Sequence, residues 1–302
     1  MRHFLNTLVQ IVHSESVGSV KGVWRHLNWQ ARKLSHQFPC EIPLGSSRLF
    51  VDQADSVAAL VNAMGTYDFN NMSFLQTMLV RFGGVFVDVG ANIGPYTLIA
   101  SEVSSCRVIS IEPHPSAFRM LTNNIRWNRR TNVTSFDVAL SDKNGCSWLT
   151  DGCELSVNRI AAPDSTGGML PIRTRTLQSV CSELGVIPDF IKIDVEGHEG
   201  SVLNGLGAFA SAAKAVWIEG GERGEIARRM SAAGYLGPYF VHYKTMMIDQ
   251  LAAARREDPI FLRRDFLEDV LNCGFRLDCA ASHLVENPDE PIATRNRQPQ
   301  FQ

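Results

Sequence analysis

An α/β protein whose parallel sheet is flanked by helices is the fold that this sequence predicts. Strand-like and helix-like patterns alternate from Val85 to about Val241, as a chain of strand–helix–strand units requires. The first of these strands, 85–89, is apolar and branched, and it leads into a turn that contains Gly90 and Gly94. Glycine permits positive φ and lets the backbone approach a ligand closely, so this turn predicts the entrance to a nucleotide-type pocket.

The chain before this unit predicts a helical extension over residues 1–71. Apolar residues recur there at helical spacing, at Val20, Val23, Trp24, Leu27, Ala31 and Leu34. Residues 4, 5, 8, 9 and 12 also share one helical face. That face favours docking on the body or on a partner such as a second copy of the chain, and less often on a membrane surface, over a secretory signal. A short strand near 48–51 and an amphipathic helix over 71–81 precede the sheet.

The remaining elements follow in order through the predicted domain, 72–286. We expect further strands at 107–111, 133–138, 190–193, 215–218 and 235–241, and helices through 98 and at 116–127, 177–184, 201–206 and 222–233. Between 140 and 175 the alternation is weak and glycine is frequent, which favours hairpins or short strands over the pocket. The polar residues 287–302 offer little to bury, so we expect a disordered tail there.

Composition restricts the class of protein. With 302 residues, 45% of them hydrophobic and 20% charged, the chain can bury a sizeable core, and no stretch approaches a transmembrane span. A net charge of −2 argues against a nucleic-acid partner, because such proteins usually carry a basic excess. The seven cysteines are scattered without a C-x-x-C pair, which predicts reduced thiols and a cytoplasmic protein.

The glycine turn differs from two common phosphate-binding loops. A dinucleotide fold would have glycine at positions 92 and 95, where this chain has Asn92 and Pro95, and this argues against a nicotinamide oxidoreductase. A P-loop would continue with Gly-Lys-Ser/Thr, which does not follow here. Asp88 also puts negative charge at the mouth, which suits a cationic or amino-bearing ligand better than a polyphosphate.

Acidic residues stand at the C-terminal ends of three predicted strands, at Asp88, Glu112 and Asp194. In open parallel sheets, ligands bind at these ends. Glu112 follows Gly90 by 22 residues (112 − 90), a spacing at which a carboxylate can accept both hydroxyls of a ribose. Capping of the next helix by Glu112 is the alternative. The pattern therefore predicts a nucleoside site without a pyrophosphate cradle.

A second cluster of polar residues lies in IKIDVEGHE, 191–199, where an apolar strand ends. This loop carries four ionisable side chains that cannot all be buried without partners: Asp194, Glu196, His198 and Glu199. The loop therefore either lines a solvent-filled cleft or binds a cation, and a solvated surface turn is the alternative. With Glu219 these side chains could offer ligands to a cation such as Mg²⁺. The spacing does not demand a metal, so we assign no metal ligands.

Together, VFVDVGANIGPYTL, SIEP, DVALSD and FIKIDVEGHE resemble the FkbM family of S-adenosylmethionine-dependent methyltransferases over about residues 65–235. The resemblance implies a Rossmann-like class I methyltransferase fold, with a seven-stranded, mostly parallel sheet that contains one reversed strand. It also implies O-methylation of a saccharide or small metabolite, with S-adenosylhomocysteine as the second product. The residues that it implies for the cofactor are Asp88, Gly90, Asn92 and Gly94 at the methionine part, Glu112 at the ribose, Asp137 and Ala139 at the adenine, and Asp194 near the methyl group.

Methyl transfer to a sugar hydroxyl requires that the hydroxyl lose its proton. His198, with an unperturbed pKa near ~6.5, is the best-suited base in the loop, Glu196 is the second choice, and Asp194 completes the expected catalytic set. Two rivals remain open: a non-catalytic nucleoside-binding protein whose N-terminal helices recruit a partner, and a methyltransferase that acts on nitrogen.

Overall fold

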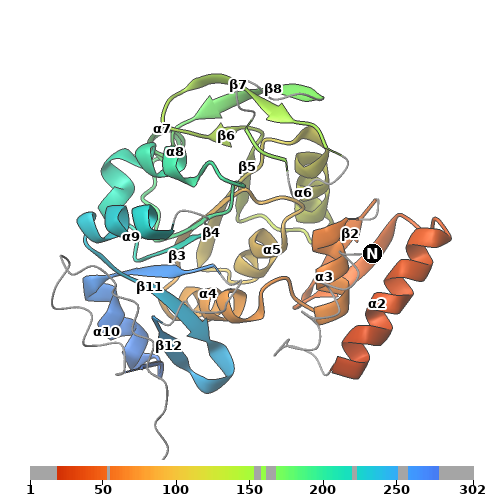
Figure 1. Ribbon diagram of the computed structural model, residues 1–302, viewed down its shortest axis with the longest axis horizontal. Coiled ribbons are helices and arrows are strands. Elements are labelled where there is room, and N and C mark those ends of the chain that lie inside the picture. Colours follow the sequence, from red (N-terminus) through yellow and green to blue (C-terminus); the bar gives the residue numbers. More distant parts are fainter. Residues whose placement is uncertain are drawn as a thin grey trace, which may run out of the picture.

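The computed structural model describes residues 19–52, 55–152, 158–160, 168–219, 223–250 and 258–278. A nine-stranded sheet forms the centre of this part of the chain (Figure 1). From one edge to the other, its strands are β14 (Arg276–Leu277), β12 (Met247–Asp249), β11 (Tyr235–His242), β13 (Ile260–Arg263), β10 (Ala215–Ile218), β9 (Phe190–Ile193), β3 (Gly84–Val89), β4 (Cys106–Ile111) and β5 (Val133–Phe136). The five strands from β10 to β5 are parallel to one another, and β13 runs against both of its neighbours. The predicted α/β fold with a mostly parallel sheet is confirmed, but the sheet has nine strands instead of the expected seven, and β12 and β14 as well as β13 run against the parallel strands.

Helices cover both faces of the sheet. They are α4 (Phe69–Phe82), α5 (Pro95–Ser101), α6 (Pro115–Trp127), α7 (Leu177–Leu184), α8 (Glu199–Asn204), α9 (Arg223–Ala232) and α10 (Arg264–Asn272), with 3-10 turns η2 (Gly207–Ser211) and η3 (Tyr243–Thr245). The side chains of β3 alternate between two cores: Phe86 packs with residues of α4, α5 and α10, and Val87 packs with residues of α7, α8 and α9. Burial on both faces explains why the predicted strands are almost continuously apolar.

The strand order produces a switch point beside β3. The chain runs outward from β3 to β4 and β5, and then returns to the other side of β3 as β9. In doubly wound sheets, a crevice opens at the C-terminal strand ends where the order reverses in this way. The turn after β3 and the loop after β9 therefore meet at one place.

The N-terminal extension contains α2 (Ser19–Leu34), a hairpin of β1 (Cys40–Leu44) and β2 (Ser47–Val51), and α3 (Ser56–Met64). The strand predicted near 48–51 is β2, and its partner β1 was not predicted. The apolar face predicted on α2 is turned outward, since Val20, Trp24, Leu27 and Leu34 are 86%, 64%, 52% and 82% exposed. Trp29 is instead buried in the main core. Residues 1–12 and 287–302 lie outside the described residues.

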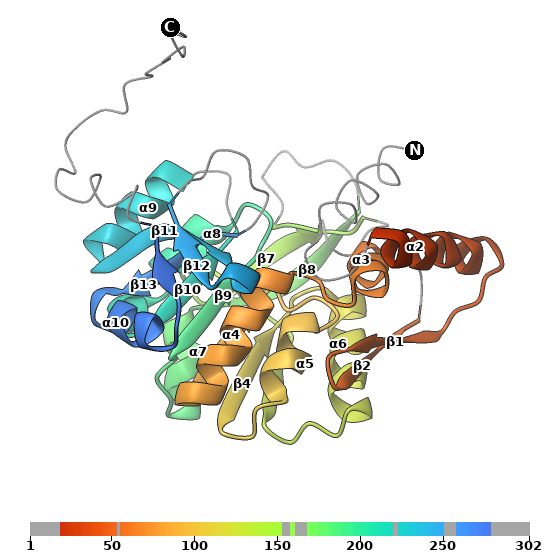
Figure 2. The same ribbon diagram turned by 90° about the horizontal axis from the view of Figure 1, so that it is seen from below.

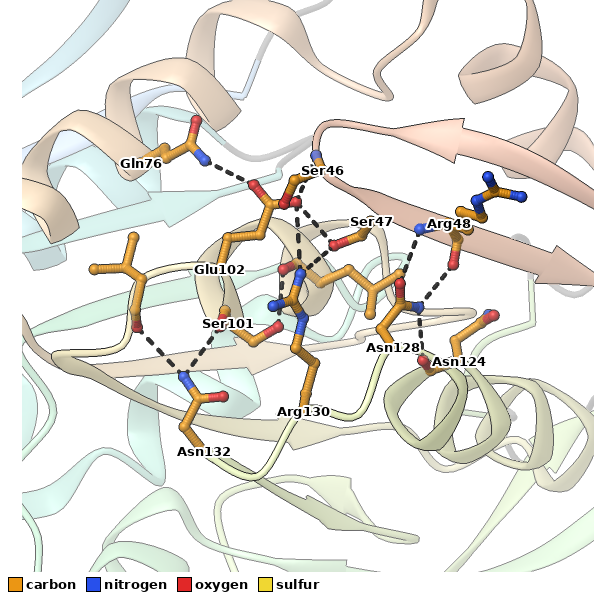
Figure 3. A network of polar contacts seen from close by, with 12 residues as sticks. Ser46, Ser47, Arg48, Gln76, Ser101, Glu102, Asn124, Asn128, Arg130 and Asn132 are labelled. Atoms are coloured by element: carbon orange, nitrogen blue, oxygen red, sulfur yellow. Dashed lines mark hydrogen bonds and ion pairs between the residues drawn. The ribbon is translucent and has the colours of Figure 1, made fainter.

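A polar network attaches the β1–β2 hairpin to the body (Figure 3). The Ser47 hydroxyl donates to Glu102 Oε1 over 2.8 Å, and Arg130 Nη2 donates to Ser47 Oγ over 2.6 Å. The Asn128 side chain both donates to the carbonyl of Arg48 and accepts from its N–H, at 2.7 and 2.9 Å. Because these bonds link segments far apart in the sequence, the hairpin is part of the folded body rather than a separate module.

A small second sheet fills the stretch in which hairpins or short strands were predicted. It contains β6 (Ala139–Leu140), β7 (Gly145–Thr150) and β8 (Met169–Arg175), with β7 and β8 antiparallel. Figure 1 shows it beyond β5, at that edge of the main sheet, and Figure 2 shows the molecule from below.

Two further results concern the last elements and the thiols. The strand predicted at 235–241 is not the last one, because β12, β13, α10 and β14 follow it. These strands have two to four residues each, too few for an alternating pattern to be recognised.

The described cysteines are free thiols, namely Cys40, Cys106, Cys146, Cys181 and Cys273. Within the described ranges, no helix combines the length and the apolar character that crossing a membrane requires.

Candidate functional site

A cavity opens at the C-terminal ends of β3, β4 and β9. Its walls come from the turn after β3, the segment after β5, the loop after β9, the small sheet and α3. The lining residues are Ser56, Val57, Leu60, Tyr67, Asp88, Val89, Gly90, Ala91, Asn92, Pro95, Tyr96, Ile111, Glu112, Pro113, Val138, Ala139, Leu140, Leu149, Asn158, Arg159, Ile160, Lys192, Asp194, Val195, Glu196 and His198. Residues of the extension and of the central domain thus share one site.

The turn after β3 lies against the loop after β9. Gly90 has φ +80°, and a Cβ atom added to it would lie 1.7 Å from the backbone oxygen of Asp194. Gly90 and Ala91 both donate their N–H groups to the carbonyl of Ile111, at 2.9 and 3.0 Å. This contact between two strand ends therefore requires glycine at position 90, whether or not a ligand is bound.

Glu112, at the end of β4, is held by backbone amides. Its Oε2 accepts from the N–H of Asn92 over 2.9 Å, and its Oε1 accepts from the N–H of His114 over 2.8 Å. His114, not Glu112, caps α6, so the alternative role as a helix cap does not apply. Burial raises the pKa of Glu112 to about 7, although the two amide hydrogen bonds oppose this rise. A partly protonated carboxyl therefore faces the cavity, and hydroxyl donors would favour its charged form.

Asp88 is almost completely buried, and its side chain serves the interior of the site. Thr97 on α5 donates to Asp88 Oδ2 over 2.7 Å, and the Thr97 hydroxyl also lies 2.7 Å from Ser110 Oγ. Burial raises the pKa of Asp88, against the charge of Lys192 and the hydrogen bond from Thr97. In register, Lys192 on β9 and Ser110 on β4 are the direct neighbours of Asp88.

The segment after β5 supplies an apolar wall with Val138, Ala139 and Leu140. Asp137 does not line the cavity. Its carboxylate is 61% exposed and pairs with Arg173 at 2.7 Å. Of the two residues expected at an adenine, only Ala139 faces the site.

Asp194, at the end of β9, is surrounded by groups that stabilise its negative charge. Lys192 Nζ lies 2.5 Å from Asp194 Oδ2, and Glu219 shares a hydrogen bond with Asp194. Burial alone would raise the pKa of Asp194, but Lys192 and these hydrogen bonds lower it. Burial and the neighbouring Asp194 raise the pKa of Glu219 to about 10, so Glu219 carries a proton.

Three carboxyl groups of the described residues could accept a cation, because oxygens of Asp194, Glu196 and Glu219 lie within 4.8 Å of one another. His198 is not part of this group.

Glu196 and His198 both line the cavity but differ in their hydrogen bonding. Burial, with the charges of Asp194 and Glu199, raises the pKa of Glu196 to about 7, and Glu196 has the unusual φ of +53°. His198 Nε2 lies 3.0 Å from Ser141 Oγ, and burial lowers its pKa. The imidazole is therefore neutral near pH 7 and already has a partner.

Some lining residues were not predicted from the sequence. Lys192 stands in the apolar strand FIKI, and a lysine within a buried strand was a signal for a charged partner on the next strand. Tyr67, whose pKa is raised by burial and by Asp194, and Arg159 belong to the site because of tertiary contacts that no local pattern reveals. The same is true of the α3 residues.

Comparisons with known proteins identify the family of the chain. Residues 88–277 match the model of the methyltransferase FkbM domain. The hexuronic acid methyltransferase AglP of Haloferax volcanii is 30% identical over 196 residues, which are 62% of this chain and 77% of that protein. Among solved structures, M. jannaschii TYW2 in complex with AdoMet is similar at a TM-score of 0.40, with 17% identity over 74% of this chain and 85% of that chain. A putative rRNA methylase from Clostridium thermocellum also has a TM-score of 0.40, with 8% identity over 64% of this chain and 93% of that chain. The family model covers more than half of the chain, and the protein therefore belongs to the FkbM methyltransferase family.

Proposed function

We propose that the enzyme transfers a methyl group from S-adenosylmethionine to a hydroxyl group of a saccharide. The observation that carries this proposal is the pair of carboxyl groups on either side of β3. Glu112 has the position and the hydrogen bonding that suit a ribose, and Glu196 has a pKa of about 7, which suits a base. The family and the saccharide-modifying relative support the same reaction.

The residues present fit S-adenosylmethionine. Asn92 Oδ1 is buried in the cavity wall without a hydrogen-bond partner in the described part of the chain, so it can accept from the amino group of the methionine part. Gly90 and Gly94 shape the turn beside it, Glu112 would accept from the ribose, and Ala139 lies in the apolar wall for the adenine. When bound, S-adenosylmethionine supplies a methyl group on a positive sulfonium, and the Asp194 carboxylate would favour that charge.

Glu196 is the base in this proposal, which reverses the order expected from the sequence. A base works best when its pKa is near the working pH, and the raised pKa of Glu196 meets this condition. His198 already shares a hydrogen bond with Ser141, so we assign it to positioning the acceptor. The Glu196 carboxylate would take the hydroxyl proton as the acceptor oxygen attacks the methyl carbon.

Arg159 favours an acceptor that carries its own carboxylate. Among the described residues, two cationic side chains line the cavity, those of Lys192 and Arg159. Lys192 is 2% exposed and pairs with Asp194, whereas Arg159 is exposed and forms no ion pair with a described residue. Arg159 also lowers the pKa of Glu196, so its positive charge acts on the acceptor end of the cavity. A uronic acid residue, which the relative's name also specifies, would match this cation.

Mass spectrometry with an acceptor panel tests the proposal. The protein and S-adenosylmethionine are incubated with glycosides of glucuronic acid, galacturonic acid, glucose and galactose. We expect the uronic acids to carry a methyl ether, which survives mild alkali, whereas a methyl ester is hydrolysed. An ether is expected because only a hydroxyl acceptor, and not a carboxylate, requires a base. Arg159→Gln should lower kcat/KM for uronic acids about 10-fold or more, and should lower kcat/KM for neutral glycosides much less, since these lose only the effect of Arg159 on the pKa of Glu196. Methyl esters, or methylation of amino sugars alone, would contradict hydroxyl transfer.

A further inference from the structure

The outward face of α2 carries an apolar stripe that no described element covers. Val20, Trp24, Leu27 and Leu34 are all more than half exposed, and Ala31 completes the stripe. The intervals alternate between four and three residues, which keeps the stripe on one side of the helix. Figures 1 and 2 both show α2 at the edge of the molecule, where a large flat partner can reach it. The other side of α2 is already used, since Trp29 and His26 are buried.

Positive charge follows the stripe along its length. Lys21, Arg25 and Arg32 are separated by four and seven residues, so they form a row beside the apolar side chains. Lys33 adds a fourth cation, and the helix contains no acidic residue. None of the four cations forms an ion pair with a residue in the described ranges.

The charge distinguishes between the possible occupants of this face. An alternating four-and-three stripe would also fit a coiled coil with a second copy of the chain. However, two copies would bring four cations each to the contact with no acidic side chain on either helix to pair with them. A bilayer surface with anionic head groups satisfies both features, because the apolar stripe enters the interface and the cations face the head groups.

We propose that α2 is an interfacial helix that binds the enzyme to anionic membrane surfaces. The helix has 16 residues and lies flat on the surface rather than crossing it. Trp24 is the central anchor, because the indole ring prefers the boundary between head groups and hydrocarbon. This inference does not depend on the identity of the methyl acceptor.

Flotation of the 302-residue protein with vesicles tests the proposal. One set of vesicles contains phosphatidylcholine alone, and the other contains about one third phosphatidylglycerol. We expect binding to the anionic vesicles only, with a loss of about fivefold or more in the double variant Trp24→Ser, Leu27→Ser. Lys21→Gln combined with Arg32→Gln should weaken binding similarly, and raised salt should mimic that effect.

Matched controls separate membrane binding from damage to the fold. Val80 and Ile187 are 69% and 63% exposed on other parts of the surface, so the variant Val80→Ser, Ile187→Ser should bind vesicles as the unmodified protein does. All variants should keep the melting temperature and the affinity for S-adenosylhomocysteine, since none alters the cavity.

Three results would overturn the proposal. The first is equal binding to neutral and anionic vesicles, and the second is no binding to either. The third is a dimer in light scattering that becomes a monomer in Trp24→Ser, Leu27→Ser, which would assign the stripe to a second copy.

Discussion

On the β4 side of the cavity, backbone amides hold the acidic side chain, whereas on the β9 side the acidic side chains hold one another. Glu112 accepts from two backbone N–H groups. Asp194, in contrast, depends on Lys192 and on the proton of Glu219. The position of Glu112 is fixed by the backbone, whereas the arrangement of the β9 carboxyl groups relative to one another depends on which of them carries a proton. If the β4 side binds the cofactor and the β9 side activates the acceptor, as proposed, the two functions can be disturbed separately, except at Gly90, where the two sides touch.

Gly90→Ala should have the largest effect, because it acts on both sides together. The new Cβ would lie 1.7 Å from the Asp194 carbonyl oxygen, and neither backbone segment can yield without shifting a strand end. We expect the affinity for S-adenosylhomocysteine to fall about 100-fold or more in calorimetric titration, with a lower melting temperature.

Gly185→Ala is the matched control for this variant. Gly185 has φ +63°, and a Cβ atom there would have no neighbour within 4 Å, so the substitution introduces the backbone strain without the clash. Gly185→Ala should keep normal cofactor affinity. If Gly90→Ala binds as well as Gly185→Ala, the two sides of the cavity do not meet as described.

Glu196→Gln should reduce turnover by about 10²-fold or more while leaving cofactor affinity near normal, because it removes a base on the β9 side only. In the unmodified enzyme, the base is competent only when deprotonated. With a pKa raised to about 7, kcat/KM for the acceptor, measured at saturating S-adenosylmethionine so that Glu112 does not contribute, should increase as pH rises through 7 and level off above it. This ionisation should disappear from the profile of Glu196→Gln.

His198→Ala is the comparison that makes this prediction sharp. If His198 only positions the acceptor through its bond to Ser141, the variant should raise KM more than it lowers kcat, and the pH profile should persist. Loss of the ionisation near pH 7 in His198→Ala, with Glu196→Gln unaffected, would restore the histidine as the base.

Glu112 should give a smaller, purely binding effect. Because its pKa is raised to about 7 and ribose hydroxyls would favour the anion, affinity for S-adenosylhomocysteine should increase about tenfold from pH 6 to pH 8, with proton release. Calorimetry in two buffers of different ionisation enthalpy measures those protons. Glu112→Gln should weaken binding and abolish the pH dependence, whereas an unchanged affinity would refute the ribose contact.

The sequence predicted the parts of the fold and of the site that have local signals, and it did not predict the parts that depend on tertiary contacts. Glu112, Gly90 and Asp194 could be located because strand ends and glycine turns have local signals, and strands 190–193 and 215–218 are observed as predicted. The outward face of α2 and the roles of Lys192 and Arg159 could not be assigned. Helical spacing shows that a stripe exists but not whether it faces the core, and register between β3 and β9 decides that Lys192 meets Asp88.

Removal of divalent cations should have the smallest effect. Asp194, Glu196 and Glu219 could accept a cation, but the Lys192 ammonium and the Glu219 proton already offset the negative charge of that group. We therefore expect turnover to change less than about twofold in EDTA, and added Mg²⁺ to have no effect. Loss of turnover in EDTA that Mg²⁺ restores would instead assign these three side chains to a cation. In that case Glu219→Gln should increase the Mg²⁺ concentration needed for half-maximal turnover, because it replaces a carboxylate ligand by a neutral amide and does not touch the β4 side.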